Sequence, residues 1–184
     1  MTRFTTNRRL VLAGAAAALL PMRQVLAQVG GGDWFAMVQA HHAEIAHSFE
    51  ELLASSGSTY LAREELVRKI TFQLGAHAFA EEMTIYPAIA LTGGMPDSDK
   101  LYLDQAHAKV MDAQLEMQAR LKDKGKWLEA ARLLQSAVLR HAKEDEEARI
   151  FPVLRSKLDP AANAALATNY KRYFDSVSLV RLQV

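Results

Sequence analysis

The sequence contains no cysteine and carries no strong excess of charge of either sign. The absence of cysteine excludes disulfides, thiolate metal sites and cysteine nucleophiles. The net charge is +1 over 184 residues, but residues 1–27 hold four arginines and no acid, which leaves 18 basic against 21 acidic residues in the remainder. This balance gives no indication of a nucleic-acid partner. Half of the residues are hydrophobic, which is enough for the core of one domain.

An apolar run long enough to span a membrane is also missing from the N-terminal segment. The run Leu10–Leu20 follows a basic start and is too short to cross a bilayer, which is typical of an export signal. Arg8-Arg9 before this run resembles a twin-arginine signal; an ordinary secretory signal or an uncleaved amphipathic anchor is the alternative. We therefore expect residues 1–27 to direct residues 28–184 to the bacterial periplasm through the twin-arginine or general export machinery, without a stable membrane span in the mature form.

The alternating pattern of β-strands is absent over any useful length, whereas helical periodicity recurs along the chain. Asp33 and Asp159-Pro160 are typical starts of helices, and Ser55-Ser56-Gly57 and Lys124-Gly125 are typical breaks. The sequence predicts an all-α fold, an antiparallel up-down four-helix bundle with a short fifth helix at the C-terminus. The expected helices cover residues 34–55, 60–90, 99–123, 126–157 and 160–174.

Each of the four long helices carries one histidine within its apolar stripe. A lone histidine on an apolar face is usually a hydrogen-bonded core residue. Four of them, together with carboxylates, would be costly to bury without a shared cation, because unpaired buried polar groups each cost about 1–3 kcal/mol. The predicted stripes are Phe35, Val38, His42, Ile45, Phe49 and Leu52; Val67, Ile70, Leu74, His77 and Glu81; Leu103, His107, Val110, Gln114 and Met117; and Leu134, Val138 and His141.

The two halves of the chain repeat each other with an offset of 65 residues. "HAFAEEMTIYP" in the first half corresponds to "HAKEDEEARIFP" in the second, which has one extra residue. A repeated helix pair is expected to pack with approximate two-fold symmetry, which would bring the His/carboxylate helices face to face. The corresponding positions are His42 and His107, His77 and His141, Glu81 and Glu146, and Tyr86-Pro87 and Phe151-Pro152.

The extra residue leaves two candidates for the second carboxylate. His77 and Glu81 are four residues apart and share one helical face. Asp145 has the same spacing from His141, whereas Glu146 is five residues away and aligns with Glu81 when counted from the proline. Glu146 reaches the same site only if a π-helical bulge absorbs the extra residue, and such bulges are common at functional sites. We favour Glu146 and keep Asp145 as the alternative.

These motifs over residues 34–155 resemble the hemerythrin-like (HHE cation-binding) family. The resemblance implies a four-helix bundle with two non-haem iron ions, oxo- or hydroxo-bridged, with bridging carboxylates between terminal histidines. It also implies a protein that binds or reacts with O2 or a related small oxidant, peroxide or NO. The metal ligands implied are His42, His77, Glu81, His107, His141 and Glu146, with Asp145 as the less favoured substitute for Glu146.

Met111 stands where the oxygen-carrying hemerythrins have a further histidine, which argues against simple oxygen carriage. The alternative is a metal-binding or storage module for iron, zinc or manganese without turnover, because mixed His/carboxylate sites suit all three metals. A third and weaker hypothesis is a helical bundle that serves as an interaction module and holds no metal. No electron-donor site is visible, so whether the protein is an enzyme stays open at this point.

Other histidines and acids fit the ligand pattern less well. Glu44-x-x-His47 spells the motif of ferritin-like di-iron proteins, but that class needs a second copy, and this sequence has none. We expect Glu44 and His47 at the surface. His41 precedes a stripe histidine and is a candidate for a supporting or substitute ligand. Glu82 is expected to be solvated or to support the ligands from behind.

Overall fold

The computed structural model describes residues 32–120 and 124–181, and all regular structure in these two ranges is helical. The expected all-α fold is therefore confirmed, while the predicted export signal lies outside the described residues. Among the described helices, none combines the length and apolar character that a membrane crossing requires. The elements are α2 (Trp34–Ala54), η1 (Ser55–Gly57), α3 (Tyr60–Met83), α4 (Ile85–Leu91), α5 (Met95–Ala119), α6 (Lys124–Arg140), η2 (His141–Ile150), α7 (Phe151–Lys157) and α8 (Pro160–Arg181).

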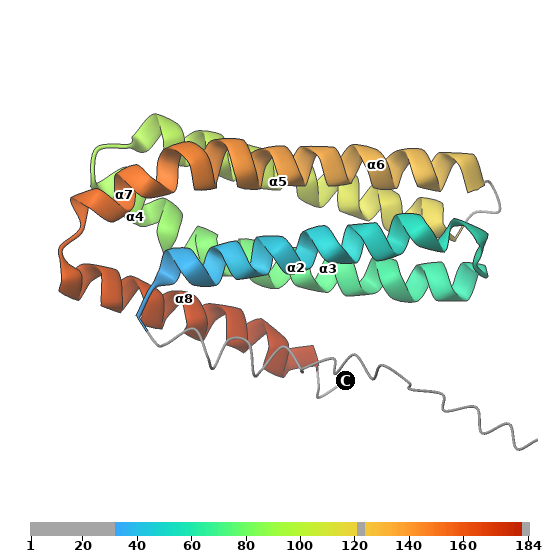
Figure 1. The fold of residues 1–184 in the computed structure, drawn as a ribbon, viewed down its shortest axis with the longest axis horizontal. Helices are drawn as coiled ribbons and strands as arrows, with labels where there is room; N and C mark the ends of the chain where they lie inside the picture. Colours follow the sequence, from blue (N-terminus) through green and yellow to red (C-terminus); the bar gives the residue numbers. More distant parts are fainter. Residues whose placement is uncertain (1–31, 121–123, 182–184) are drawn as a thin grey trace, which may run out of the picture.

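The long helices α2, α3, α5 and α6 lie alongside one another, and α8 packs beneath them against α2 and α3 (Figure 1). The helix α3 contacts α2 and α5, and α6 contacts α5 and α2. The short helices α4 and α7 lie together at one end of the molecule, where α8 also begins (Figure 1). Every long helix thus reaches the region between the four axes, where a buried site can be assembled from several elements.

The ends of the helices follow the local sequence. Asp33 caps α2 by accepting hydrogen bonds from the backbone N–H groups of Phe35 and Ala36, as expected. Asp159 caps α8 by accepting from the backbone N–H of Ala162 at 2.7 Å. The helix α8 is longer than predicted and reaches Arg181.

The helix expected over residues 60–90 is divided at Thr84, which has φ −135° and ψ −62°. The reason is Pro87, because a proline ring clashes with the carbonyl of the residue four positions earlier and supplies no N–H. The third helix begins earlier than expected, at Met95, with Gly94 as its cap.

The apolar core consists of two clusters, one toward each end of the long helices. The first contains Trp34, Val38, Tyr86, Phe151 and Tyr170, and the second contains Ile45, Phe49, Val67, Trp127 and Leu134. His42 lies between Val38 and Ile45 along α2, so it falls at the boundary of the two clusters. The polar residues described next occupy this boundary.

Candidate metal centre

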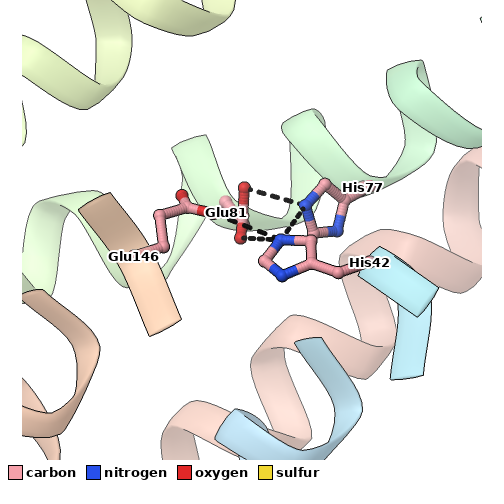
Figure 2. A group of neighbouring side chains, drawn as sticks. All are labelled: His42, His77, Glu81 and Glu146. Atoms are coloured by element: carbon pink, nitrogen blue, oxygen red, sulfur yellow. Dashed lines mark hydrogen bonds and ion pairs between the residues drawn. The ribbon is translucent and has the colours of Figure 1, made fainter. Parts of the chain in front are cut away.

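Four buried side chains from three elements converge between the two apolar clusters. His42 comes from α2, His77 and Glu81 from α3, and Glu146 from η2, and Figure 2 shows them gathered around one region. Their candidate ligand atoms lie within 4.8 Å of one another. The Nε2 atoms of His42 and His77 are 3.0 Å apart, His42 Nε2 lies 3.2 Å from Glu146 Oε2, and His77 Nε2 lies 3.2 Å from Glu81 Oε2. Imidazoles and carboxylates in this arrangement are a ligand set for a transition-metal ion.

Glu146 extends the cluster toward a third histidine. Its Oε1 lies 3.2 Å from His141 Nε2, while its Oε2 faces His42, so one carboxylate spans two imidazoles. The hydroxyl of Tyr86 donates to Glu146 Oε1 at 2.8 Å and lies 3.2 Å from His141 Nε2. The same hydroxyl lies 3.2 Å from Glu81 Oε2, so Tyr86 contacts both carboxylates and, of the three rings, that of His141, which makes the two sides of the site unequal.

The three imidazoles share one orientation, with Nε2 in the cluster and Nδ1 hydrogen-bonded outside it. An outer partner that accepts the Nδ1 proton fixes the tautomer in which Nε2 is free to bind a metal. This orientation suits metal ligation by all three rings. The outer partners are Glu147 Oε1 for His42 at 2.7 Å, the Tyr170 hydroxyl for His77 at 3.0 Å and Asp104 Oδ2 for His141 at 3.2 Å.

The two buried carboxylates differ in their electrostatic surroundings. Burial raises the pKa of Glu81 well above its usual value, and the negative charge of Glu146 raises it further. Burial also opposes ionisation of Glu146, but the adjacent charge and hydrogen bond of His141, together with the nearby ring of His42, hold its pKa below its usual value. Without a cation, these surroundings therefore favour the protonated form of Glu81 and the ionised form of Glu146.

The hydrogen bonding of the two carboxylates also favours a bound metal ion. Both carboxylates are fully buried, yet among the described residues Glu81 Oε1 has no hydrogen-bond partner, and Glu146 Oε2 has the ring of His42 beside it at 3.2 Å without a well-formed hydrogen bond. Such orphaned acceptors are rare in native interiors, because each one costs the desolvation of its polar group. A cation coordinated by these two oxygens would remove that cost.

His41 is buried next to His42 but turns away from the cluster. Its Nδ1 lies 2.8 Å from the Tyr170 hydroxyl, which also reaches His77, and its ring stacks on Phe174 with centroids 3.8 Å apart. Burial lowers the pKa of His41 to about 3, and the nearby charges of His42 and Lys171 add to this effect, so the ring is neutral. His41 thus supports the ligands through Tyr170 and is not one of the converging groups.

The segment His141–Ile150 is π-helical, as the placement of Glu146 required. The backbone N–H of Phe151 donates to the carbonyl of Glu146, five residues earlier. This wider turn buries Glu146 completely. Asp145, the alternative, instead forms ion pairs with Lys100 at 2.6 Å and Arg149 at 3.0 Å. Of the two candidates, only Glu146 joins the cluster of His42, His77 and Glu81.

A second group of possible ligands consists of Asp104, His141 and Asp145, whose ligand atoms also lie within 4.8 Å of one another. The ammonium group of Lys100 lies 2.6 Å from Oδ2 of Asp104 and 2.6 Å from Oδ2 of Asp145. The two carboxylates are thus already paired with cationic side chains, because Arg149 also contacts Asp145 at 3.0 Å. This group consequently lacks the unpaired buried oxygens that distinguish the first cluster.

The expectation that His107 lies in an interior stripe is wrong, because the structure exposes it on the outer face of α5. The rest of that predicted stripe is exposed as well, with Leu103 at 71%, Val110 at 56% and Met117 at 57%. The buried face of α5 carries Leu101, Gln105, Asp112, Leu115 and Ala119. The predicted stripe and the buried face both have heptad-like spacing. The prediction took the more apolar of the two as the interior face, and it is wrong because the interior face of α5 is partly polar.

Gln105 is the residue of α5 that reaches the site, where the repeat predicted the side chain of His107. Its Nε2 donates to Glu81 Oε2 and to the Tyr86 hydroxyl, both at 2.6 Å. Sequence reasoning missed Gln105, and it used Tyr86 only to align the two halves. The polar stripe of Gln105 and Asp112 on α5 was the signal that could have identified the interior face.

The remaining expectations concern residues near the cluster. His47 is exposed and lies near the acids Glu50 and Glu51, as expected for a surface residue, while Glu44 is half-buried. Glu82 pairs with Lys109 at the surface. Neither Glu44-x-x-His47 nor Glu82 contributes a group to the cluster.

No family profile matches this chain, and no solved structure matches it. A curated protein from Nostoc sp. named "DNA nickase" is 27% identical over 135 residues, which cover 73% of this chain. The chain spans only 37% of the length of that relative.

Proposed function

We propose that this chain is a hemerythrin-like, non-haem iron protein that binds or reacts with O2 or a related small oxidant, peroxide or NO. The observation that carries the proposal is the convergence of His42, His77, Glu81 and Glu146 within 4.8 Å, with both carboxylates fully buried and Glu81 Oε1 without a hydrogen-bond partner among the described residues. Burial of these groups is costly without a cation and favourable with one. Iron is proposed from the resemblance of the motifs, because the donor set also suits manganese and zinc.

The residues divide into two sides of one centre. His42 and His77 would hold an ion on the first side, His141 would hold a second, and Glu81 and Glu146 would lie between them. Bound iron would supply a Lewis-acidic, redox-active position at which a small oxidant is taken up. Glu147, Tyr170 and Asp104 keep the three rings in the tautomer that ligation needs.

The proposed architecture is the up-down four-helix bundle of the hemerythrin type, with α8 as the additional fifth helix. Its support is the lateral packing of α2, α3, α5 and α6 (Figure 1) and the convergence of cluster side chains from α2, α3 and η2. As part of the same proposal, residues 1–27 export the chain to the periplasm.

The alternative function, a metal-binding module without turnover, is favoured by one observation. The exposure of His107 leaves His141 as the single histidine on its side, where the Tyr86 hydroxyl already contacts Glu146. A site with one well-provided position would bind a single iron, zinc or manganese ion. The stoichiometry of binding separates this alternative from the two-iron centre.

A nucleic-acid activity is a further possibility raised by the relative named "DNA nickase". The matched segment is 37% of that protein, so its activity cannot be assigned to this part. Residues 28–184 have more acids than bases, which disfavours binding to a phosphate backbone. Incubation of the iron-loaded protein with supercoiled plasmid tests this directly, and we expect no nicked product.

The test of the proposed function is an anaerobic titration of metal-free full-length protein with Fe(II), followed by exposure to O2, peroxide and NO in separate samples. We expect about two bound irons per chain and a visible absorption band that appears on oxidation. One bound ion and no spectral response to any oxidant would favour the module without turnover. Failure to bind any iron would contradict the proposal.

A further inference from the structure

A cavity of about 250 Å³ lies beside the cluster, among α2, α3, α5 and α6. His42, His77 and His141 line its inner end. Gly75 and Lys109 also line it and are exposed, so they mark its mouth. The cavity therefore connects the solvent with the three imidazoles.

The walls of the cavity are mostly apolar. Ile45 comes from α2, Leu74 and Ala78 from α3, Ala108 from α5 and Val138 from α6. Apolar cavities of about 150 Å³ are known to stay dry and to bind benzene. This cavity is larger, so its size exceeds what O2, peroxide or NO requires.

One buried polar atom beside the cavity lacks a partner. Gln105 is only 6% exposed, and its Nε2 donates to Glu81 and Tyr86, which leaves Oε1 as an acceptor without a hydrogen-bond partner among the described residues. Gln105 lines the cavity next to the imidazoles. The atom is covered while the cavity is empty, so a guest with an O–H or N–H group would satisfy this acceptor after a small turn of the Gln105 side chain. Leaving the acceptor unmet costs about 1–3 kcal/mol.

We propose that the cavity binds a small, uncharged organic molecule with an apolar body at least the size of benzene and one hydrogen-bond donor, which is directed to Oε1 of Gln105. Binding itself needs no metal, whereas a role for the guest as the co-substrate of the centre rests on the proposed function. The guest lies against the rings of His42, His77 and His141, so the proposal names the class of organic substrate that the centre would act on.

The test uses 4-fluorophenol and its isostere 4-fluorotoluene as probes, with binding to metal-free full-length protein followed by ¹⁹F NMR. We expect 4-fluorophenol to bind. We expect 4-fluorotoluene to bind roughly 2- to 10-fold more weakly, because 4-fluorotoluene has no O–H group to donate a hydrogen bond to Gln105. No binding of 4-fluorophenol at millimolar concentration overturns the proposal. Equal affinity for the two probes overturns the role of Gln105.

Two substitutions fill the cavity from opposite walls, Gly75→Leu on α3 and Ala108→Leu on α5. An added Cβ at Gly75 meets nothing within 4 Å, and replacing glycine within a helix is stabilising, so this variant is expected to fold. We expect each variant to lose at least 10-fold in affinity for 4-fluorophenol. The matched control is Gly57→Leu, at a glycine with equal free space that does not line the cavity, and its affinity should not change.

The metal content of the same variants separates this proposal from the function proposed above. Gly75→Leu leaves every proposed ligand in place, so it should load iron as the wild type does. Phenol binding without any iron binding by the wild type would sink the metal centre and keep the cavity site. Full affinity for 4-fluorophenol in both filled variants would sink the cavity site and leave the metal centre untouched.

Discussion

At the residue scale, adjacent acids have different environments because of the local helix type. Glu146 is fully buried between His42 and His141, while Asp145 faces Lys100 and Arg149 at the partly exposed surface. A sequence alignment of the two halves could favour Glu146, but only the π-helical turn decides between these neighbours.

The first prediction compares these two acids. Glu146→Gln removes a proposed ligand and should lower iron affinity by more than the 10- to 100-fold typical of losing an outer partner of a ligand. Asp145→Asn breaks ion pairs with Lys100 and Arg149 and should leave iron affinity within a few-fold of the wild type. Anaerobic calorimetric titration with Fe(II) measures both. The reverse ranking would show that Asp145 is the ligand.

The second prediction concerns Tyr170, whose hydroxyl contacts the Nδ1 atoms of both His77 and His41. Tyr170→Phe keeps the buried ring and removes the hydroxyl, so His77 loses the group that fixes its tautomer. We expect a 10- to 100-fold loss of iron affinity and a destabilisation of about 1–3 kcal/mol. Tyr173→Phe is the control, since that half-buried residue on the same helix has no contact with the cluster. Equal iron affinity in the two variants would remove Tyr170 from the site.

The third prediction follows from Asp112, a buried acid on α5. Burial raises its pKa to about 6, the hydrogen bond from Thr71 opposes that effect, and the charge of Glu116 adds to it. The unfolded state releases this proton near pH 4 and the folded state only near pH 6. The contribution of protonated Asp112 to the free energy of unfolding is therefore fully present below about pH 4. It decreases as the pH rises to about 6 and is absent above that pH.

Asp112→Asn keeps the acceptor for Thr71 and removes the charge. We expect the free energy of unfolding at pH 7.5 to rise by up to about 3 kcal/mol, and the difference from the wild type to vanish below about pH 4. Urea unfolding of metal-free protein at both pH values measures this. Asp99→Asn, at an exposed position on the same helix, should show little change. A loss of stability at pH 7.5 in Asp112→Asn would contradict the pKa assignment.

At the scale of the elements, the π-helical segment η2 accommodates one extra residue, and the flanking helices α6 and α7 keep their buried faces. His141 and Glu146 are five residues apart in a π-helix, while His77 and Glu81 are four apart in an α-helix. Both spacings bring a histidine and a carboxylate to the same face. Deleting one exposed residue from η2 should therefore convert it to an α-helix and preserve both flanking faces.

The fourth prediction tests this conversion by deleting Glu144, which is exposed and lies between the two site residues. We expect the deletion variant to fold and to bind iron, because its His-x-x-x-Glu spacing equals that of His77 and Glu81. Deleting exposed Ser136 from the regular helix α6 is the control. That deletion rotates the following residues by about 100° and should abolish iron binding. Loss of iron binding in both deletions would mean that the π-helix itself is required.

How far the sequence predicts these elements depends on the helix. The stripe of α2, with Val38, His42, Ile45 and Phe49, is confirmed because apolar residues mark a single face. The hydrophobic pattern could not predict the buried face of α5. The exposed face of this helix is apolar at Leu103, and its buried face is polar where it meets the site and the cavity. The break at Thr84 was missed, although Pro87 marks it.

At the scale of the whole molecule, the polar cluster lies between two apolar clusters that pack the ends of the helices. Ligands that α2, α3 and η2 contribute to one ion would tie these elements together, and a ligand that binds only the folded state stabilises it by mass action. The sequence predicted that His42, His77 and Glu81 meet, because each falls in a marked helical stripe, whereas Glu146 was favoured over Asp145 by the alignment of the two halves. It did not predict the contribution of α4, α5 and α8 through Tyr86, Gln105 and Tyr170, since these contacts depend on how the helices pack.

The central claim is that His42, His77, Glu81 and Glu146 hold a metal ion. Its most direct test is an anomalous difference map at the iron absorption edge, from crystals of protein loaded anaerobically with Fe(II). The account predicts a peak at coordination distance from the Nε2 atoms of His42 and His77 and from an oxygen of each carboxylate. A map without a peak among these four residues, or with its single peak among Asp104, His141 and Asp145, would contradict it.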